Sequence, residues 1–415
     1  MQFLYNLFIR LFGLSVLLVS PFNMKARKWI IGRRGILDKL KNDIRKTDDV
    51  IWFHCASLGE FEQGKPVIEK LRSTFRGYKI LLTFFSPSGY DIRQDYKGAD
   101  FVYYLPNDTP FNARQFIKIV HPRLVFFIKY EFWFNYINEL NRNKIPIYIV
   151  SAIFRRGQYF FKPWGWWGRR QLQKVTYFFV QDENSLALLR LVKVYHAEIS
   201  GDTRFDRVAE LAREKSTFPV IERFKNNKAV FIAGSTWPAD EDLLLEVLKK
   251  SKEDFKIIVA PHIVNNEHIS QLMNKFSNYQ PVCLSDEGND QFNQSRVMII
   301  DSIGKLSKIY EYGTLAYIGG GFGVGIHNTL EAATYGMPVI FGPNYQRFRE
   351  AVELMELGCA FPIHNADECA EVLNLLLTDK LKYDECATSA RQYVLQNAGA
   401  TDKVIEKAKE YLVVN

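Results

Sequence analysis

Short apolar runs alternate with helical patterns along most of the chain, and this alternation constrains the fold more than any other feature. In the first half, apolar runs of strand length lie at residues 50–54, 79–84, 101–104, 124–128, 145–150 and 177–180. Helical segments separate them, over residues 61–74, 110–120 and 132–143. Strands that alternate with helices over short connections form parallel, doubly wound sheets. We therefore expect an α/β domain in this half.

A second series of the same kind follows a charged, strand-free stretch at residues 205–228. Its expected strands lie at 229–233, 256–260, 297–300, 315–318 and 338–341, with helices at 240–250, 266–276 and 327–335. A final helix is expected at 401–413. A chain of 415 residues is long enough for two separate cores. Two Rossmann-like, doubly wound domains facing a cleft are the simplest architecture, and such clefts usually hold ligands.

The expected division has five parts. They are an apolar and basic N-terminal segment at 1–34, a first Rossmann-like domain at 35–205, a linker at 206–226, a second Rossmann-like domain at 227–398 and a C-terminal helix at 399–415.

The N-terminal segment is apolar first and basic afterwards. Arg10 interrupts its apolar run, so only about half a bilayer span remains before Pro21, against the ~20 residues that a spanning helix needs. We expect a helix that lies in or dips into the membrane interface, with the following basic residues on anionic lipid headgroups. A cleaved signal peptide and a helix packed on the protein's own core are the alternatives.

The charge balance favours anionic partners. A formal net charge of +8 suits lipid headgroups, nucleotide-linked substrates or nucleic acid alike. There is no zinc-spaced cysteine pair or nucleic-acid motif, so we expect no nucleic-acid partner. Residues 155–170, RRGQYFFKPWGWWGRR, interleave basic and aromatic side chains, a pattern typical of a membrane interface or a lipid-phosphate pocket.

Two expected strands end beside an acid. The stretch WFHCASLGEF (52–61) leads to Glu60, and KYEFWFN (129–135) places Glu131 beside Trp133. An acid at the start of a helix is the ordinary explanation. The functional alternative is a base held at the carboxyl end of a strand, where open α/β sheets bind ligands. Arg204 lies where the chain leaves the first domain; it is either a solvated linker residue or a cation that neutralises a departing phosphate.

A glycine-rich turn, GGGFGVG (319–325), follows one expected strand and precedes an expected helix. Glycines let backbone N–H groups approach an anion closely, and a helix N-terminus favours negative charge. A tight strand–helix connection would also explain them. Glu331, inside that expected helix, would accept hydrogen bonds from ribose hydroxyls. No residue pair is placed to hold a metal, so we expect none.

These motifs together resemble a known family. In order along nearly the whole chain, HCASLGE (54–60), YLPNDTP (104–110), YEFWFN (130–135), GDTRFD (201–206) and GIHNTLEAATYGMPVIFGP (325–343) are similar to motifs of the 3-deoxy-D-manno-octulosonic acid (Kdo) transferases. The resemblance implies an inverting GT-B glycosyltransferase of lipopolysaccharide synthesis, without a cofactor. Its donor substrate would be CMP-Kdo and its acceptor a lipid A precursor, at the cytoplasmic face of the inner membrane.

The resemblance also implies roles for individual residues. Glu60 matches the catalytic base, and Glu131 and Arg204 match groups that support the transition state. The stretches GKL (304–306) and NTLE (328–331) match the family's CMP-binding motifs. With the neighbouring strand ends and loops, the expected nucleotide-binding residues are Ser235, Thr236, Pro261, His262, Gly304, Lys305, Leu306, Gly325, His327, Asn328, Thr329, Leu330 and Glu331.

Three positions depart from the family pattern. The stretch APHIV (260–264) lacks the arginine expected to meet the nucleotide, Lys129 replaces the first acid of the E-x-E-L-W motif, and Ile326 replaces a glycine. Two other functions stay open on the residues alone. One is a GT-B enzyme that uses a uridine-linked sugar, and the other is a non-catalytic lipid-binding protein.

Overall fold

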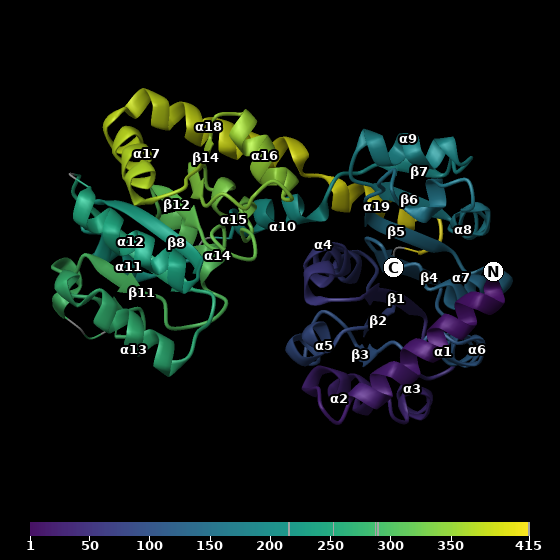
Figure 1. The fold of residues 1–415 in the computed structure, drawn as a ribbon. Helices are drawn as coiled ribbons and strands as arrows, with labels where there is room; N and C mark the ends of the chain where they lie inside the picture. The colour runs from purple at the N-terminus through teal and green to yellow at the C-terminus, as the bar shows by residue number, and fades with distance from the viewer. Residues whose placement is uncertain (215, 252, 287, 289, 414–415) are drawn as a thin grey trace. The chain divides into compact units, whose positions relative to one another are not determined.

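The computed structural model describes residues 1–214, 216–251, 253–286, 288 and 290–413, which form two compact units. Unit 1 comprises Met1–Arg207 together with the residues from Ala398 onward, and unit 2 comprises Val208–Asn397 (Figure 1). The boundary between them falls inside helix α10 (Thr203–Leu211). The stretch expected as a linker is therefore largely helical, since α11 (Pro219–Lys225) follows.

Unit 1 is built around a seven-stranded sheet in the order β3-β2-β1-β4-β5-β6-β7. Its strands are β1 (Val50–Cys55), β2 (Lys79–Phe84), β3 (Phe101–Tyr104), β4 (Leu124–Ile128), β5 (Ile147–Ala152), β6 (Tyr177–Val180) and β7 (Ala197–Ile199). All adjacent strands pair in parallel. The six expected runs are confirmed as strands, and the short β7 is an addition.

Helices cover both faces of this sheet. They are α3 (Ile36–Asp43), α4 (Leu58–Thr74), α5 (Pro87–Arg93), α6 (Pro110–Val120), α7 (Phe134–Arg142), α8 (Trp166–Leu172), α9 (Glu183–Leu191) and α19 (Ala400–Ala408). Successive strand residues point to opposite faces. Trp52 therefore belongs to a core that includes residues of α6 and α7, while Phe53 belongs to a second core. That second core takes Phe61 from α4 and Val404 from α19.

The C-terminal helix α19 is thus part of unit 1 although the residues before it belong to unit 2. The Asp206 carboxylate fixes its start by accepting the backbone N–H groups of Gly399 and Thr401 and the Thr401 hydroxyl. Further along, the Tyr148 hydroxyl donates to the Lys407 carbonyl at 2.9 Å.

Unit 2 contains a second seven-stranded sheet, in the order β10-β11-β9-β8-β12-β13-β14. Its strands are β8 (Ala229–Thr236), β9 (Phe255–Pro261), β10 (Val282–Cys283), β11 (Val297–Ile299), β12 (Leu315–Ile318), β13 (Val339–Phe341) and β14 (Ala360–Pro362). Its later helices are α12 (Pro238–Lys250), α13 (Asn266–Lys275), α14 (Leu306–Ile309), α15 (Leu330–Ala333), α16 (Arg349–Glu356), α17 (Ala366–Thr378) and α18 (Lys380–Asn397).

The predicted helix at 327–335 was wrong in length, because α15 spans only Leu330–Ala333. The Asn328 side chain accepts the Leu330 N–H at 3.1 Å, which holds the chain in a turn instead of an earlier helical start. At the other end Gly336 adopts a φ of 75°, a left-handed conformation that stops a helix.

Two N-terminal helices, α1 (Gln2–Val19) and α2 (Met24–Ile31), precede the first sheet. Helix α1 is long and apolar enough to cross a membrane, a criterion that the core helix of a soluble protein or a signal sequence also meets. Ile9 is the only buried residue of α1. One face docks on unit 1, where the Tyr5 hydroxyl donates to Asp108 and the Gln2 amide to Asn135. The opposite face exposes large apolar side chains, namely Phe3, Leu4, Leu7, Phe8, Leu11, Leu14 and Leu18. A core helix would bury that face.

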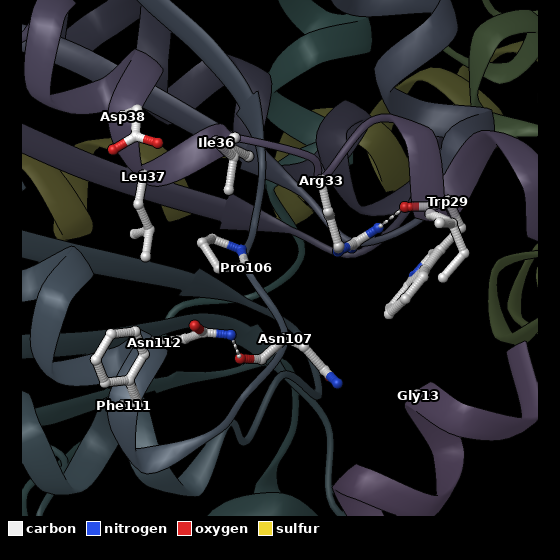
Figure 2. A pocket seen from close by; sticks show the side chains of 12 residues that line it. Gly13, Trp29, Arg33, Ile36, Leu37, Asp38, Pro106, Asn107, Phe111 and Asn112 are labelled. Atoms are coloured by element: carbon white, nitrogen blue, oxygen red, sulfur yellow. Dashed lines mark hydrogen bonds between the residues drawn. The ribbon is translucent and has the colours of Figure 1, made fainter. Parts of the chain in front are cut away.

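Arg33 fixes these helices to the sheet. Its guanidinium lies 3.9 Å from the Trp29 ring centre and donates to the carbonyls of Trp29, Phe85 and Leu105. Burial lowers the pKa of Arg33 to about 9, and no described carboxylate forms an ion pair with it. Figure 2 shows it at the wall of a cavity of about 560 Å³ that Gly13 also lines. The N-terminal helices are therefore a built part of unit 1.

Candidate functional site

Each sheet changes its winding direction at one pair of adjacent strands. In unit 1 the pair is β1 and β4, and in unit 2 it is β8 and β12. Open doubly wound sheets bind their ligands outside the carboxyl ends of the strands at this switch point. The acids Glu60 and Glu131 follow β1 and β4, while Thr236 ends β8 and the glycine-rich turn follows β12. Both groups of expected site residues thus lie at switch points.

Glu60 lies in the first turn of α4 and is partly buried. Its carboxylate accepts a hydrogen bond from the Ala56 backbone N–H, just before the helix. This contact is the ordinary helix-start role that the sequence also allowed. It orients the carboxylate at the carboxyl end of β1 without sealing it in the core.

The surroundings of Glu60 change its acidity. Burial and the negative charge of Glu131 raise the pKa of Glu60 to about 8, against opposing contributions from the Ala56 N–H and the Lys129 cation. A base is most effective when its pKa lies near the working pH, because it is then both available and strong. Two carboxyl groups with different environments at one switch point are typical of a catalytic site.

A buried hydrogen-bond network lies beside Glu131. The Trp133 indole N–H donates to Nε2 of the fully buried His54 at 3.0 Å, and His54 Nδ1 lies 2.9 Å from Thr83 Oγ1. Because Nε2 accepts, Nδ1 carries the proton, and the Thr83 hydroxyl is free to donate to the Phe53 carbonyl at 3.2 Å. Glu131 Oε2 lies 3.5 Å from the same Nε2. Both ring nitrogens of His54 therefore have partners, as expected for an inner residue.

Arg204 is held at the start of α10. Its Nε and one terminal nitrogen each lie 2.9 Å from Oδ2 of Asp202, which also accepts the Gln63 amide at 3.1 Å. Burial raises the pKa of the Tyr130 phenol; the charge of Glu60 also raises it, and the charge of Arg204 lowers it. The structure therefore brings all three expected catalytic residues into one neighbourhood of unit 1. Asp202, Gln63 and Tyr130 were not expected from sequence.

The glycine-rich turn of unit 2 packs tightly on its own sheet. A Cβ on Gly319 would overlap the Ser235 carbonyl oxygen, and one on Gly321 would overlap the backbone of Gly342. Gly323 differs, since a Cβ there would meet only one atom, the Gly320 carbonyl oxygen at 3.9 Å. Close packing therefore accounts for Gly319 and Gly321, and the turn keeps open space at Gly323.

Stacked rings adjoin this turn. The His262 ring stacks on Trp237 on one side and on His327 on the other, with centroids 4.6 Å apart in both cases. The Trp237 indole N–H also donates to His327 Nε2 at 3.2 Å. Burial and the nearby His262 lower the pKa of His327. Pro261, the residue before His262, is the last residue of β9.

The remaining expected residues surround α14 and α15. Gly304 has a φ of 83° and open space at its Cβ position, and Lys305 directly precedes α14, which begins at Leu306. The Asn328 amide donates to the Glu331 carboxylate at 3.1 Å. Gly325 has a φ of 114°. Thr329 is fully buried and its hydroxyl has no partner within the described chain.

The chemistry available to the two units is therefore distinct. Unit 1 offers a titratable acid, a second acid and a positioned guanidinium. Unit 2 offers a glycine turn, stacked rings and the Asn328–Glu331 pair, all suited to holding a polar ligand that carries a nucleobase. Within the described ranges, no three His, Cys, Asp or Glu side chains are grouped so that they could hold a metal ion.

Comparison with known proteins relates this chain to one enzyme family. Residues 31–207 match the family model described as 3-deoxy-D-manno-octulosonic-acid transferase (kdotransferase). The chain is 26% identical over 380 residues to the 3-deoxy-D-manno-octulosonic acid transferase of Haemophilus influenzae, covering 88% of each protein. It is 28% identical over 398 residues to a bifunctional glycosyltransferase/methyltransferase of Fusobacterium nucleatum, covering 92% of this chain and 60% of that protein.

Among solved structures, the chain is similar to UDP-GlcNAc 2-epimerase from Neisseria meningitidis, with a TM-score of 0.62 and 16% identity. The match covers 87% of this chain and 100% of that one, and it concerns the fold of two Rossmann-like domains, the architecture of GT-B enzymes. The family match, the relatives and this fold agree with the motifs of the sequence. The family model over residues 31–207 and the curated relatives together support the family of 3-deoxy-D-manno-octulosonic acid transferases, and these homologues indicate a glycosyltransferase.

Proposed function

We propose that the protein transfers Kdo from CMP-Kdo to a hydroxyl of a lipid A precursor, with inversion and with Glu60 as the base. The observation that carries the proposal is the partly buried Glu60 at the unit 1 switch point, whose pKa is raised to about 8 beside Glu131. The names of the matched family and of its relatives supply the transferred sugar, Kdo. The resemblance of the sequence motifs implies CMP-Kdo as the donor and a lipid A precursor as the acceptor.

In the proposed reaction, ionised Glu60 takes the proton of the acceptor hydroxyl. The acceptor oxygen forms a bond to the anomeric carbon of Kdo from the face opposite the phosphate. The bond from that carbon to the phosphate oxygen breaks, and CMP leaves with the electron pair. Arg204 offsets negative charge on the phosphate as it departs, and Asp202 orients its guanidinium. Glu131 keeps the pKa of the base high.

Unit 2 is the proposed holder of CMP. The stacked rings of His262 and His327 offer an apolar surface for the cytosine, and Glu331 offers acceptors to the ribose hydroxyls. The turn at Gly323 leaves room for the phosphate. Because α15 is only four residues long, backbone N–H groups of the turn rather than a long helix dipole would stabilise the phosphate.

The exposed apolar face of α1 supports attachment to the inner membrane from the cytoplasmic side. Exposed apolar side chains on one face and a polar docked face on the other are typical of a helix lying at a membrane surface. An acceptor with acyl chains is found in that surface, so attachment would bring the enzyme to its substrate.

A direct assay tests the proposal. Purified full-length protein is incubated with CMP-Kdo and a purified lipid A precursor, and the lipid product is analysed by mass. A mass increase of one or more Kdo residues with matching release of CMP is expected. Release of CMP without acceptor dependence, or no product, would exclude the transferase activity and favour a lipid-binding role.

A second measurement identifies the nucleotide. CMP is expected to raise the Tm of the protein more than UDP does at equal concentration, because only a ligand that binds the folded state stabilises it. Stabilisation by UDP alone would replace the donor with a uridine-linked sugar.

A further inference from the structure

A cavity of about 560 Å³ opens where α1 meets α6, α7 and α8. The residues that matter for its chemistry come from all four helices and the turn after α8, namely Gln2, Asn6, Arg114, Arg142, Arg170 and Lys174. None of the proposed catalytic or nucleotide-binding residues lines it. Its volume lies within the ~300–1,000 Å³ that is usual for small-molecule sites.

Positive charge dominates the walls. Glu139 is the only acid among the lining residues, and its carboxylate pairs with Arg142 at 3.4 Å. No described carboxylate forms an ion pair with Arg114, Arg170 or Lys174. Three cations without a carboxylate partner in one cavity repel one another, and an anion between them would relieve that repulsion.

Two of the cations are held in place by neutral groups. The Lys174 ammonium donates to the amide oxygens of Asn138 and Gln171, which leaves one of its three N–H donors for another acceptor. The Arg170 guanidinium lies 5.2 Å from the Trp166 ring centre. Burial and the charge of Arg142 lower the pKa of Lys174, as expected for crowded like charges. The donors are therefore positioned without being neutralised.

The cavity adjoins the surface that is suited to a membrane. Gln2 and Asn6 in its wall belong to the docked face of α1, whose other face exposes Phe3 and Leu7. Just before and at the start of α8, Trp164 and Trp166 are 65% and 49% exposed. Tryptophan and arginine together are typical of the headgroup level of a bilayer. Of the other aromatic residues of this stretch, Phe160 lies in the core and Phe161 and Trp167 pack against it.

We propose that this cavity binds the phosphate of an anionic membrane lipid, as an anchoring subsite separate from the transferase site. Arg114 and Arg170 would donate paired N–H groups to the phosphate oxygens, and Lys174 would add a single charged donor. The apolar face of α1 would hold the acyl region beside it. The proposal rests on the membrane attachment proposed above and adds a preference for one lipid class.

The test measures binding of the full-length protein to vesicles by sedimentation. One set is pure phosphatidylcholine, and the other contains equal parts of phosphatidylcholine and phosphatidylglycerol. The variant Arg114→Gln/Arg170→Gln is compared with the control Arg76→Gln/Arg190→Gln, which removes two exposed arginines of unit 1 that do not line the cavity.

We expect the cavity variant to lose about tenfold or more of its affinity for the phosphatidylglycerol vesicles, while binding to phosphatidylcholine through α1 is unchanged. The control variant should lose less than twofold. Equal losses in the two variants, or wild-type binding by the cavity variant, would overturn the proposal. Loss of binding to both vesicle types would instead implicate α1 and the attachment itself.

A soluble probe separates a lipid headgroup from free phosphate. Glycerol 3-phosphate is added to the wild type and the cavity variant, and Tm is measured. A rise in wild-type Tm that the variant lacks, without any vesicle preference, would assign the cavity to a soluble phosphate and overturn the lipid proposal. The transfer rate measured in detergent should be the same for the cavity variant and the control variant, because none of the four substituted arginines lies in the transferase site.

Discussion

The two switch points have the same place in their sheets but carry different chemistry. In unit 1 the positions after β1 and β4 hold ionisable side chains, Glu60, Lys129 and Glu131, whose charges act on one another. In unit 2 the corresponding positions hold closely packed glycines and stacked rings. The doubly wound sheet determines where such a site lies. The side chains at that position determine whether it presents ionisable groups or a surface suited to a ligand.

The largest expected effect is on the transfer rate and comes from a substitution in unit 1. Glu60→Gln should lower the transfer rate by about 10²–10⁴-fold, because the amide cannot accept the hydroxyl proton. CMP-induced stabilisation should persist, since the proposed CMP site lies in unit 2. Glu62→Gln, two residues along the same helix and partly exposed, is the control and should stay within threefold of the wild type. A Glu60→Gln rate within tenfold of the wild type would remove Glu60 as the base.

The next effect concerns packing in unit 2. Gly319→Ala should lower the free energy of unfolding by ~1–3 kcal/mol, because its Cβ would overlap the Ser235 carbonyl. Gly323→Ala, with its nearest atom at 3.9 Å, should change it little. Denaturant unfolding measures both. Equal losses would contradict the division between a packed and an open part of the glycine turn.

The third effect tests the coupled charges of unit 1 through the pH dependence of transfer. Because the base acts only when ionised, the wild-type rate should rise as pH increases through about 8. Glu131→Gln removes a like charge, so the pKa of Glu60 falls and the rise moves to lower pH. Lys129→Met removes a cation, so the rise moves to higher pH. If both variants moved the rise in rate in the same direction along the pH scale, ionisation of Glu60 would not be its cause.

The smallest effect tests the ring stack. His262→Ala should weaken CMP binding by about two- to tenfold, as expected for the loss of one aromatic stacking contact. The pH dependence of transfer should not move. His364→Ala, which removes an exposed histidine of unit 2, is the matched control. A titration of Tm against CMP concentration compares them, and an unchanged His262→Ala curve would exclude the stack from the nucleotide site.

Strands with long apolar runs could be predicted from sequence, and those with weak patterns could not. The run LVFFI at 124–128 is a strand at the predicted residues because every side chain in it is buried. The strands at 197–199, 282–283 and 360–362 were missed because two or three residues carry too little periodicity. The helix predicted at 327–335 failed because local side-chain hydrogen bonding outweighed helix propensity.

The candidate site shows the same limit. Glu60 and Glu131 could be found because each follows a recognisable strand, although their roles remain predictions. The pKa of Glu60 depends on tertiary burial, which no local pattern reports. The contact of Gln63 with Asp202 joins residues 139 positions apart, and Thr83 reaches His54 from a neighbouring strand. A lone histidine in an apolar run was the one available signal for that network.

The position of α19 has a consequence for synthesis. Val404, Ile405, Ala408 and Leu412 complete a core that otherwise consists of residues from the first 180 positions. Unit 1 therefore emerges from the ribosome with part of one face of its sheet uncovered, and that part stays uncovered while all of unit 2 is made. The earlier half of the protein would be the last to finish folding, and its exposed apolar surface would need protection during translation.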